Sequence, residues 1–266
     1  MATTPAFSGS VPQTYHTYLG PLIFDAYARD MTKRLAVREG ERVLELACGT
    51  GIVTEHLARS LPQRATLIAT DVSDGMLGVA RSVVRHPSVE FKQADACTLP
   101  FEDRSFDSLA AQYGVMFFAD KVRAMQEARR VLKPGGRYVF NVWDSLEHNP
   151  LPRIVHDIVC ELFPKDPPGF LAKLPYGWND RAEIERVVRA GGFERCTIET
   201  VGFPSEAPTA DHVARGFVEG TPLSSQLVER GADLARVSQT AARALAERFG
   251  ETPCRSTMRA VVVTAS

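Results

Sequence analysis

The chain has 266 residues, of which 44% are hydrophobic and 24% are charged, and its formal net charge is −1. This composition is typical of a soluble globular protein with a hydrophobic core. Because the charge is close to zero, no general electrostatic field attracts nucleic acid, which we do not expect as a partner.

The sequence contains no sign of a membrane or secreted protein. No apolar run approaches the roughly 18 residues that span a bilayer, so we expect no membrane span. Residues 1–20 lack the basic and apolar regions of a secretory signal. The five cysteines are widely spaced without a CxxC pair, which argues against a disulfide framework and against a zinc site. We therefore expect a cytoplasmic protein without a bound metal.

The first half of the chain alternates between short apolar runs and amphipathic segments. Residues 1–14 are expected to lack regular structure, and a helix is expected over residues 21–37, with Pro21 in its first turn. The strands that follow are predicted at 42–46, 66–70, 89–93, 106–113 and 137–143. The helices between them are predicted at 52–61, 73–85 and 119–132, and a turn is predicted at 133–136. Such alternation implies right-handed βαβ units and a mainly parallel sheet.

The second half is less regular, with helices predicted at 154–163 and 180–190, a strand at 196–203, mostly helix over 209–249 and a last strand at 259–264. Together these elements predict an α/β fold, a doubly wound and mostly parallel sheet with helical cap insertions over its ligand edge. The expected regions are 1–38 as an N-terminal helical lid, 39–144 as a ligand-binding core, 145–179 as a cap insertion, 180–204 as a core helix and strand, 205–250 as a helical cap insertion and 251–266 as a C-terminal core strand.

The strongest functional signal is the segment 43–51, where an apolar strand runs into small residues and a helix follows at once. Gly49 and Gly51 allow the backbone to turn tightly and to approach a ligand closely. Such turns also occur without any ligand, so the turn alone leaves both interpretations open. Glu45 favours a ligand, because a carboxylate near the end of an apolar strand is costly to bury unless it faces a polar or cationic group.

Two common phosphate-binding motifs do not fit this turn. The dinucleotide fingerprint GxGxxG requires glycine or alanine at position 54, which is Thr54 here. A P-loop requires a lysine after its glycines, and none is present. The turn is therefore not a typical site for a nicotinamide dinucleotide or for a nucleoside triphosphate.

Polar side chains follow the next strands at the same predicted edge of the sheet. Asp71 comes directly after the second strand, where an acid can accept both hydroxyl hydrogens of a ribose. Its alternative role is to cap the following helix. Asp95 follows the third strand and can accept a hydrogen bond from an amino group of a base, and Gln112 and Tyr113 end the fourth strand. These side chains predict a nucleoside-like ligand at this edge.

These segments, together with Leu-Lys-Pro-Gly-Gly at 132–136, resemble the class I S-adenosylmethionine-dependent methyltransferases. The likeness is closest to the small-molecule branch that includes the ubiquinone/menaquinone-biosynthesis enzymes, and its motifs span residues 43–143. The resemblance implies a Rossmann-like methyltransferase fold with a seven-stranded sheet. It also implies S-adenosylmethionine as the cofactor and a small molecule as the methyl acceptor.

The resemblance assigns donor-binding roles to residues that match the family's motifs. The residues so assigned are Glu45, Ala47, Gly49, Gly51, Asp71, Val72, Met76, Asp95, Ala96, Cys97 and Gln112. In the family, the positions of Glu45, Ala47 and Gly49 line the methionine moiety, and that of Asp71 holds the ribose. Val72 and Met76 would flank the adenine, and Asp95, Ala96 and Cys97 would contact its edge. Gln112 would lie near the methionine moiety or the methyl group. Ala47 stands where many members have glycine. Tyr18 and Phe24, on the helix before the first strand, are candidates for closing over the donor.

The acceptor side is less clear in the sequence. The donor's sulfonium makes its methyl group a strong electrophile, so a general base is needed only if the acceptor must lose a proton. His148, after the fifth strand, is the candidate base, with His16 in the lid as a second candidate; an ordinary loop position is the alternative for each. The candidates for an aromatic acceptor pocket, which equally suit a cap core, are Trp143, Tyr176, Trp178 and Phe217.

No run of like charges indicates a polymeric partner, and the second insertion favours a small, enclosed acceptor. A homodimer is one possible assembly. Two other functions remain open at this point. One is a regulatory protein that binds S-adenosylmethionine without catalysis, and the other is an NAD(P)-dependent oxidoreductase, against which the missing GxGxxG argues.

Overall fold

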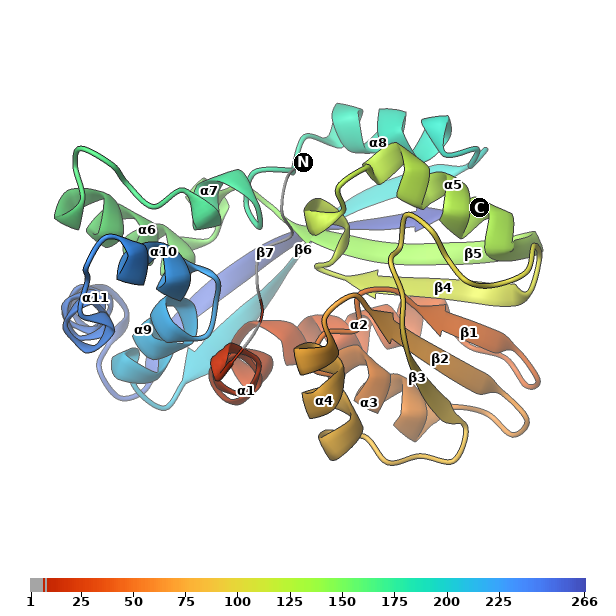
Figure 1. The fold of residues 1–266 in the computed structure, drawn as a ribbon, viewed down its shortest axis with the longest axis horizontal. Coiled ribbons are helices and arrows are strands. Elements are labelled where there is room, and N and C mark those ends of the chain that lie inside the picture. Colours follow the sequence, from red (N-terminus) through yellow and green to blue (C-terminus); the bar gives the residue numbers. More distant parts are fainter. Residues whose placement is uncertain (1–6, 8) are drawn as a thin grey trace.

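The computed structural model describes residues 7 and 9–266. Its centre is one sheet with the strand order β3-β2-β1-β4-β5-β7-β6 (Figure 1). The strands are β1 (Arg42–Glu45), β2 (Thr66–Asp71), β3 (Val89–Gln93), β4 (Phe106–Gln112), β5 (Leu132–Trp143), β6 (Cys196–Ala207) and β7 (Cys254–Ala265). The first five are parallel, whereas β7 runs antiparallel to β5 and β6. The predicted seven-stranded, mostly parallel sheet is confirmed.

Helices cover both faces of the sheet (Figure 1). On one side, α2 (Asp25–Leu35) packs against α3 (Ile52–Ser60), and α4 (Asp74–Val83) lies beside α3. On the other side, α5 (Lys121–Val131) packs against α8 (Arg181–Ala190). Each helix buries one apolar stripe against the sheet, as amphipathic helices of a doubly wound fold do.

Side-chain caps explain where several helices begin. Ser73 is the N-cap of α4, and its Oγ accepts a hydrogen bond from the backbone N of Met76 at 3.3 Å. Asp120 and Asp180 cap α5 and α8 in the same way, by accepting from backbone N–H groups of the first turn. Because these N–H groups have no partner within the helix, each cap stabilises its helix by about 1 kcal/mol.

The N-terminal helical segment begins earlier than predicted. α1 (Val11–Thr14) continues into the π-helix η1 (Tyr15–Phe24), which continues into α2. Pro21, predicted to open the helix, lies inside η1. Proline has no N–H to donate, and an irregular π-helical stretch tolerates the missing bond better than a regular α-helix does. The expectation that residues up to 14 lack regular structure is therefore wrong for Val11–Thr14.

The predicted turn at residues 133–136 is a bulge inside β5. These four residues stand opposite Asp107 of β4 alone. Gly135 supplies the left-handed backbone conformation that the bulge needs, with φ of 77°. Lys133 Nζ donates to both carboxylate oxygens of Asp107 at 2.8 Å, which ties the bulge to β4.

The last two strands, β6 and β7, extend beyond the rest of the sheet. They pair from Cys196–Ala265 at one end to Ala207–Cys254 at the other, whereas β5 pairs only with residues 260–265 of β7. Their outer halves form a two-stranded ribbon that reaches the cap helices (Figure 1). The expected division between residues 204 and 205 therefore falls inside β6.

The two insertions pack together. The first contributes η3 (Leu146–His148), α6 (Pro150–Leu162) and α7 (Phe170–Lys173), and the second contributes α9 (Ala210–Glu219), α10 (Leu223–Glu229) and α11 (Leu234–Phe249). α6 contacts α9 and α11, and α7 contacts α10. α9 also packs on η1, so the N-terminal helix lies between the cap and the sheet. Within the described residues, no helix is both long enough and apolar enough to cross a membrane.

Candidate active site

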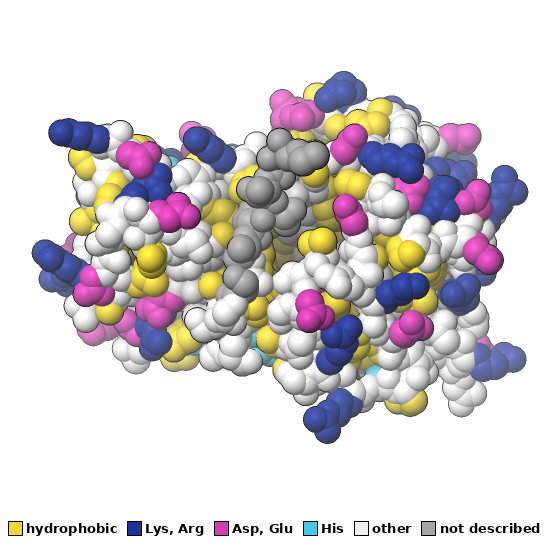
Figure 2. All heavy atoms as spheres, viewed as in Figure 1, with side chains coloured by type: hydrophobic (Ala, Val, Ile, Leu, Met, Phe, Trp, Pro, Cys, Tyr) yellow, Lys and Arg dark blue, Asp and Glu magenta, His cyan; other side chains and the backbone are white. Residues whose placement is uncertain are grey.

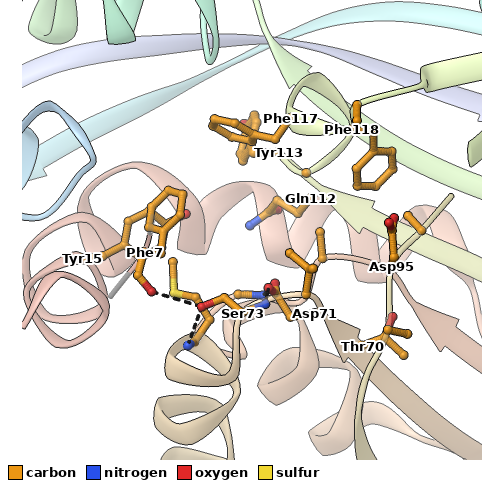
Figure 3. A pocket seen from close by; sticks show the side chains of 18 residues that line it. Phe7, Tyr15, Thr70, Asp71, Ser73, Asp95, Gln112, Tyr113, Phe117 and Phe118 are labelled. Carbon is orange, nitrogen blue, oxygen red and sulfur yellow. Dashed lines mark hydrogen bonds between the residues drawn. The ribbon is translucent and has the colours of Figure 1, made fainter. Parts of the chain in front are cut away.

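A cavity of about 140 Å³ opens at the carboxyl ends of β1, β2 and β4 (Figure 3). The strand order reverses between β1 and β4, and open α/β sheets bind ligands at this position. Figure 3 shows Phe7 and Tyr15 on one side of the cavity and Asp95 on the opposite side. The cavity is therefore bounded by strand ends and by the N-terminal segment.

Most of the residues assigned to donor binding line this cavity. They are Ala47, Gly49, Asp71, Val72, Met76, Asp95, Ala96 and Gln112. They come from four separate segments that follow β1, β2, β3 and β4. The structure thus brings together residues that lie up to 65 positions apart in the sequence, counting from 47 to 112.

Three assigned residues lie next to the cavity and not in its wall. Gly51 precedes α3 with φ of 85°, and a Cβ there would lie 3.1 Å from Cβ of Ala80, so it allows α3 and α4 to approach each other. The Sγ of Cys97 lies 3.4 Å from the backbone O of Asp120. Glu45 is buried behind the turn.

The turn after β1 holds its shape through left-handed backbone conformations at Ala47 (φ of 51°) and Gly49 (φ of 55°). Alanine is uncommon in this conformation because of its Cβ. Room for that Cβ exists because residue 114 is glycine. A Cβ added to Gly114 would lie only 2.4 Å from the Cβ of Ala47. Ala47 and Gly114 are therefore a matched pair across the cavity floor.

Asp71 ties this turn to β2. Its carboxylate accepts hydrogen bonds from the backbone N of Gly49 and of Ser73, both at 2.8 Å. Burial raises the pKa of Asp71, and these backbone N–H groups oppose that rise. A carboxylate has about four acceptor positions, so two remain for hydroxyl groups of a ligand.

Glu45 is paired inside the protein. Thr54 Oγ1 donates to Glu45 Oε2 at 2.7 Å, and burial raises the pKa of Glu45 to about 8 despite this bond. Thr54 stands at the position where the dinucleotide fingerprint GxGxxG requires glycine or alanine. The hydroxyl found there instead satisfies the buried carboxyl group.

Gln112 presents an unused acceptor. Its Nε2 donates to the backbone O of Phe24 at 3.2 Å, and its buried Oε1 has no hydrogen-bond partner among the described residues. Buried polar atoms are rarely left unpaired, and a bound ligand is one explanation for those that are. Because Gln112 lines the cavity, this atom indicates a ligand that donates a hydrogen bond there.

The N-terminal segment closes the cavity with residues that the sequence did not single out. Phe7 and Tyr15 line it, and Ser73 Oγ donates to the backbone O of Phe7 at 3.1 Å. Tyr18 instead packs against the cap, with the Arg215 guanidinium 4.9 Å from its ring. Tyr15 precedes the helix that was predicted to begin at Pro21, so no predicted helical spacing pointed to it.

The lid also contacts the glycine turn. His16 Nδ1 lies 3.0 Å from Thr50 Oγ1, and burial lowers the pKa of His16. This histidine therefore holds the N-terminal helix against the donor-side loop. It lines neither of the two cavities described for this site.

A second cavity, of about 40 Å³, adjoins the first. The two share four aromatic lining residues, which are Phe7, Tyr15, Tyr113 and Phe117. Both cap insertions and η1 contribute to the second cavity, and Phe24 lines it. Of the predicted aromatic pocket, Trp143, Tyr176 and Phe217 line it, whereas Trp178 does not. None of its lining residues in the described part of the chain is charged.

The structure does not bring His148 to either cavity. Its Nδ1 lies 3.1 Å from Ser145 Oγ and 3.5 Å from the carboxylate of Asp144, and the side chain is 45% exposed. The role of His148 as a base therefore has no geometric support and stays a prediction. Among the described residues, no group of three or more His, Cys, Asp or Glu side chains is arranged to hold a metal ion.

Comparisons with known proteins agree on one family. Residues 44–140 match the model of a methyltransferase domain. A demethylmenaquinone methyltransferase from Corynebacterium efficiens is 32% identical over 187 residues, which is 66% of this chain and 78% of the relative. Among solved structures, the YcgJ protein from Bacillus subtilis covers 90% of this chain, and 97% of its own chain is matched, at 20% identity and a TM-score of 0.59.

A further solved structure is phosphoethanolamine N-methyltransferase 2 from Haemonchus contortus in complex with phosphomonomethylethanolamine and S-adenosylhomocysteine. It is 17% identical, with a TM-score of 0.60, and the match covers 96% of this chain and 56% of that chain. At such identities the solved structures show the shared fold, whereas the match at 32% identity shows kinship.

Proposed function

Since the chain belongs to the S-adenosylmethionine-dependent methyltransferases, we propose that the cavity of about 140 Å³ holds the methyl donor and that the adjoining aromatic cavity holds a small, uncharged acceptor. The observation that carries this proposal is the shared wall of Phe7, Tyr15, Tyr113 and Phe117. Two ligands in adjoining cavities would meet there, as a methyl transfer requires.

The chemistry of the first cavity fits the donor. Asp71 offers free acceptor positions for the ribose hydroxyls, and Val72 and Met76 offer apolar contact for the adenine. Gln112 Oε1 is an unpaired acceptor that suits the donor's positively charged end. When bound, S-adenosylmethionine supplies an electrophilic methyl group. The role of Glu45 and Ala47 at the methionine moiety remains part of this proposal.

The second cavity supports an acceptor without charge. An ion placed among its aromatic walls would lose hydration without gaining a partner, which is costly. Aromatic side chains favour flat, apolar molecules by stacking and edge-to-face contact. The relative from Corynebacterium efficiens is named for demethylmenaquinone, and a ring-containing acceptor would suit these walls.

The molecular surface supports a small acceptor over a polymer. On the face shown in Figure 2, Lys and Arg side chains lie among Asp and Glu side chains and form no separate basic region. Nucleic acid binding depends on such a region. Residues 1–38 as a lid, the two insertions as an acceptor cap, a homodimer and a cytoplasmic location belong to the same proposal.

The chain's own contribution to the reaction is mainly positioning. Holding two reactants in line is worth roughly 7–11 kcal/mol of a reaction barrier. η1 and the cap exclude water from the acceptor side, and the buried hydroxyl of Tyr176 stays protonated because burial raises its pKa well above the usual value. The residues that line the second cavity therefore orient an acceptor and do not ionise it.

A transfer assay tests the proposed function. The protein is incubated with S-adenosylmethionine labelled in its methyl group and with matched pairs of neutral and charged aromatic acceptors. We expect label in neutral products only, and less of it with the Asp71→Ala variant at the same, subsaturating donor concentration. Tight donor binding without transfer to any acceptor would instead favour a regulatory protein.

A further inference from the structure

Tyr113 occupies the boundary between the two cavities under an unusual backbone constraint. Its φ is 52°, in the left-handed region that bulky residues rarely adopt. The buried Asn141 holds it there, because the backbone N of Tyr113 donates to both the main-chain O (3.1 Å) and the Oδ1 (3.0 Å) of Asn141. Strained residues of this kind cluster at ligand sites, where the surrounding structure over-determines them.

The ring of Tyr113 is fixed as firmly as its backbone. It stacks on Trp143 with a centroid distance of 3.7 Å and an interplanar angle of 9°. Phe24 and Tyr27 each lie 5.6 Å away by ring centroids, on other sides. The position of the Tyr113 hydroxyl is therefore set before any ligand arrives.

This fixed hydroxyl is buried and has no hydrogen-bond partner among the described residues. The neighbouring Tyr27 shows the contrast, because its hydroxyl donates to the backbone O of Met258 at 2.5 Å. Tyr138 also has a buried hydroxyl without a described partner, but it lines neither cavity. Leaving a buried hydroxyl unpaired costs stability, so an unpaired hydroxyl on a residue that lines both cavities indicates a partner on the ligand.

The other polar groups of the second cavity are less suited to this task. Thr221 Oγ1 already donates to the backbone O of Phe217 at 2.7 Å and accepts from the backbone N of Leu223. Tyr176 lines only the second cavity, and Tyr15 lines both cavities but is not among the residues whose buried hydroxyl lacks a described partner. Tyr113 therefore combines a place in the wall shared by both cavities with a buried hydroxyl that has no described partner.

We propose that the Tyr113 hydroxyl exchanges a hydrogen bond with an oxygen of the acceptor and thereby orients the acceptor toward the donor cavity. The acceptor is then an uncharged, flat molecule that carries a hydroxyl or carbonyl group beside the atom to be methylated. Burial raises the pKa of Tyr113 well above its usual value, so this hydroxyl keeps its proton and acts as an orienting group. The inference rests on the proposed function, because it places the acceptor beside the donor cavity.

The test uses the full chain loaded with S-adenosylhomocysteine, and it compares p-cresol with toluene, which lacks only the hydroxyl. The variants are Tyr113→Phe and, as a matched control that loses another unpaired buried hydroxyl, Tyr138→Phe. Calorimetry with p-toluate tests the charge requirement. Wild type and the control should bind p-cresol about two- to twelvefold more tightly than toluene, the range of one neutral hydrogen bond.

The Tyr113→Phe variant should lose this preference while its affinity for S-adenosylhomocysteine and for toluene stays unchanged. A purely structural role would not move the ratio between the two probes. The proposal is overturned if the ratio survives in Tyr113→Phe, if wild type shows no preference for p-cresol, or if p-toluate binds as well as p-cresol. Failure of wild type to bind S-adenosylhomocysteine would instead contradict the proposed function itself.

Discussion

The donor side and the cap side of this molecule differ in the kinds of residues that line their cavities. The donor cavity combines backbone turns and polar side chains at the ends of parallel strands, where Asp71 and Gln112 offer hydrogen bonds, with an aromatic wall that it shares with the second cavity. The second cavity is formed by aromatic side chains from η1, β5, α7 and α9, without a charged residue among those described. The difference indicates that one side recognises a polar, charged ligand and the other an apolar one. Changes outside the wall that the two cavities share should then leave the other side's ligand unaffected.

The largest loss of donor affinity is expected for the Asp71→Ala variant. It removes the carboxylate that we propose for the ribose and leaves the backbone N–H of Gly49 without its partner. Because hydrogen bonds to a charged group are lost, we expect S-adenosylmethionine binding to weaken by about 1–3 kcal/mol. Calorimetric titration measures this loss, and toluene binding to the cap side serves as the internal control. Unchanged donor affinity would remove Asp71 from the site.

The pairing of Ala47 with Gly114 gives a prediction of similar size. Gly114→Ala places a Cβ 2.4 Å from that of Ala47, and overpacking of this kind costs about 1–3 kcal/mol of unfolding free energy. Adding Ala47→Gly removes the clash and also the strain of a left-handed alanine. Urea unfolding should therefore show the double variant to be more stable than Gly114→Ala alone. If the double variant is no more stable, the two residues do not form a pair.

The residues of the donor cavity could be predicted from the sequence better than those of the cap side. Eight of the assigned donor residues line the cavity because each follows a strand within a few positions, so parallel strand ends bring them to one edge. Tyr15 was missed because η1 is a π-helix, and the predicted helix began only at Pro21. η1 also packs against α9, a contact that local residue spacing does not reveal.

The cap side could be predicted only in part. Trp143, Tyr176 and Phe217 line one cavity together, but nothing in their local sequence distinguishes them from Trp178, which lines neither cavity. Their assembly depends on two insertions that pack together over a ribbon of β6 and β7. Contacts between segments so far apart in the chain leave no periodic signal.

Glu45 should make the unfolding free energy of the protein depend on pH. Its pKa in the folded protein is about 8, above the value of 4.5 expected for an exposed carboxyl, because burial disfavours the charged form. The stability that it contributes is therefore present below pH 4.5 and is lost as the pH rises toward and past 8. The side chain introduced by Glu45→Gln cannot ionise, so the unfolding free energy of this variant should fall less than that of wild type between about pH 5 and pH 9.

Chemical unfolding of both proteins across this pH range measures the effect. The amide introduced by Glu45→Gln would still offer Thr54 an acceptor oxygen, so the comparison isolates the charge. Parallel curves for the two proteins would mean that Glu45 does not titrate in this window.

The smallest effect is expected from His148→Ala. This side chain is 45% exposed and contacts Ser145 and Asp144 outside both cavities. Substitutions at such positions usually change stability by less than about 0.5 kcal/mol. Donor binding should stay unchanged by calorimetry. A large loss of methyl transfer with donor binding intact would restore His148 as the base.

The central claim is that the cavity at the β1–β4 edge is a site for S-adenosylmethionine. Its most direct test is calorimetric titration of the purified protein with S-adenosylmethionine, S-adenosylhomocysteine and NADH in parallel. We predict that the first two bind and that NADH does not. Binding of NADH alone, or of none of the three, would contradict the account.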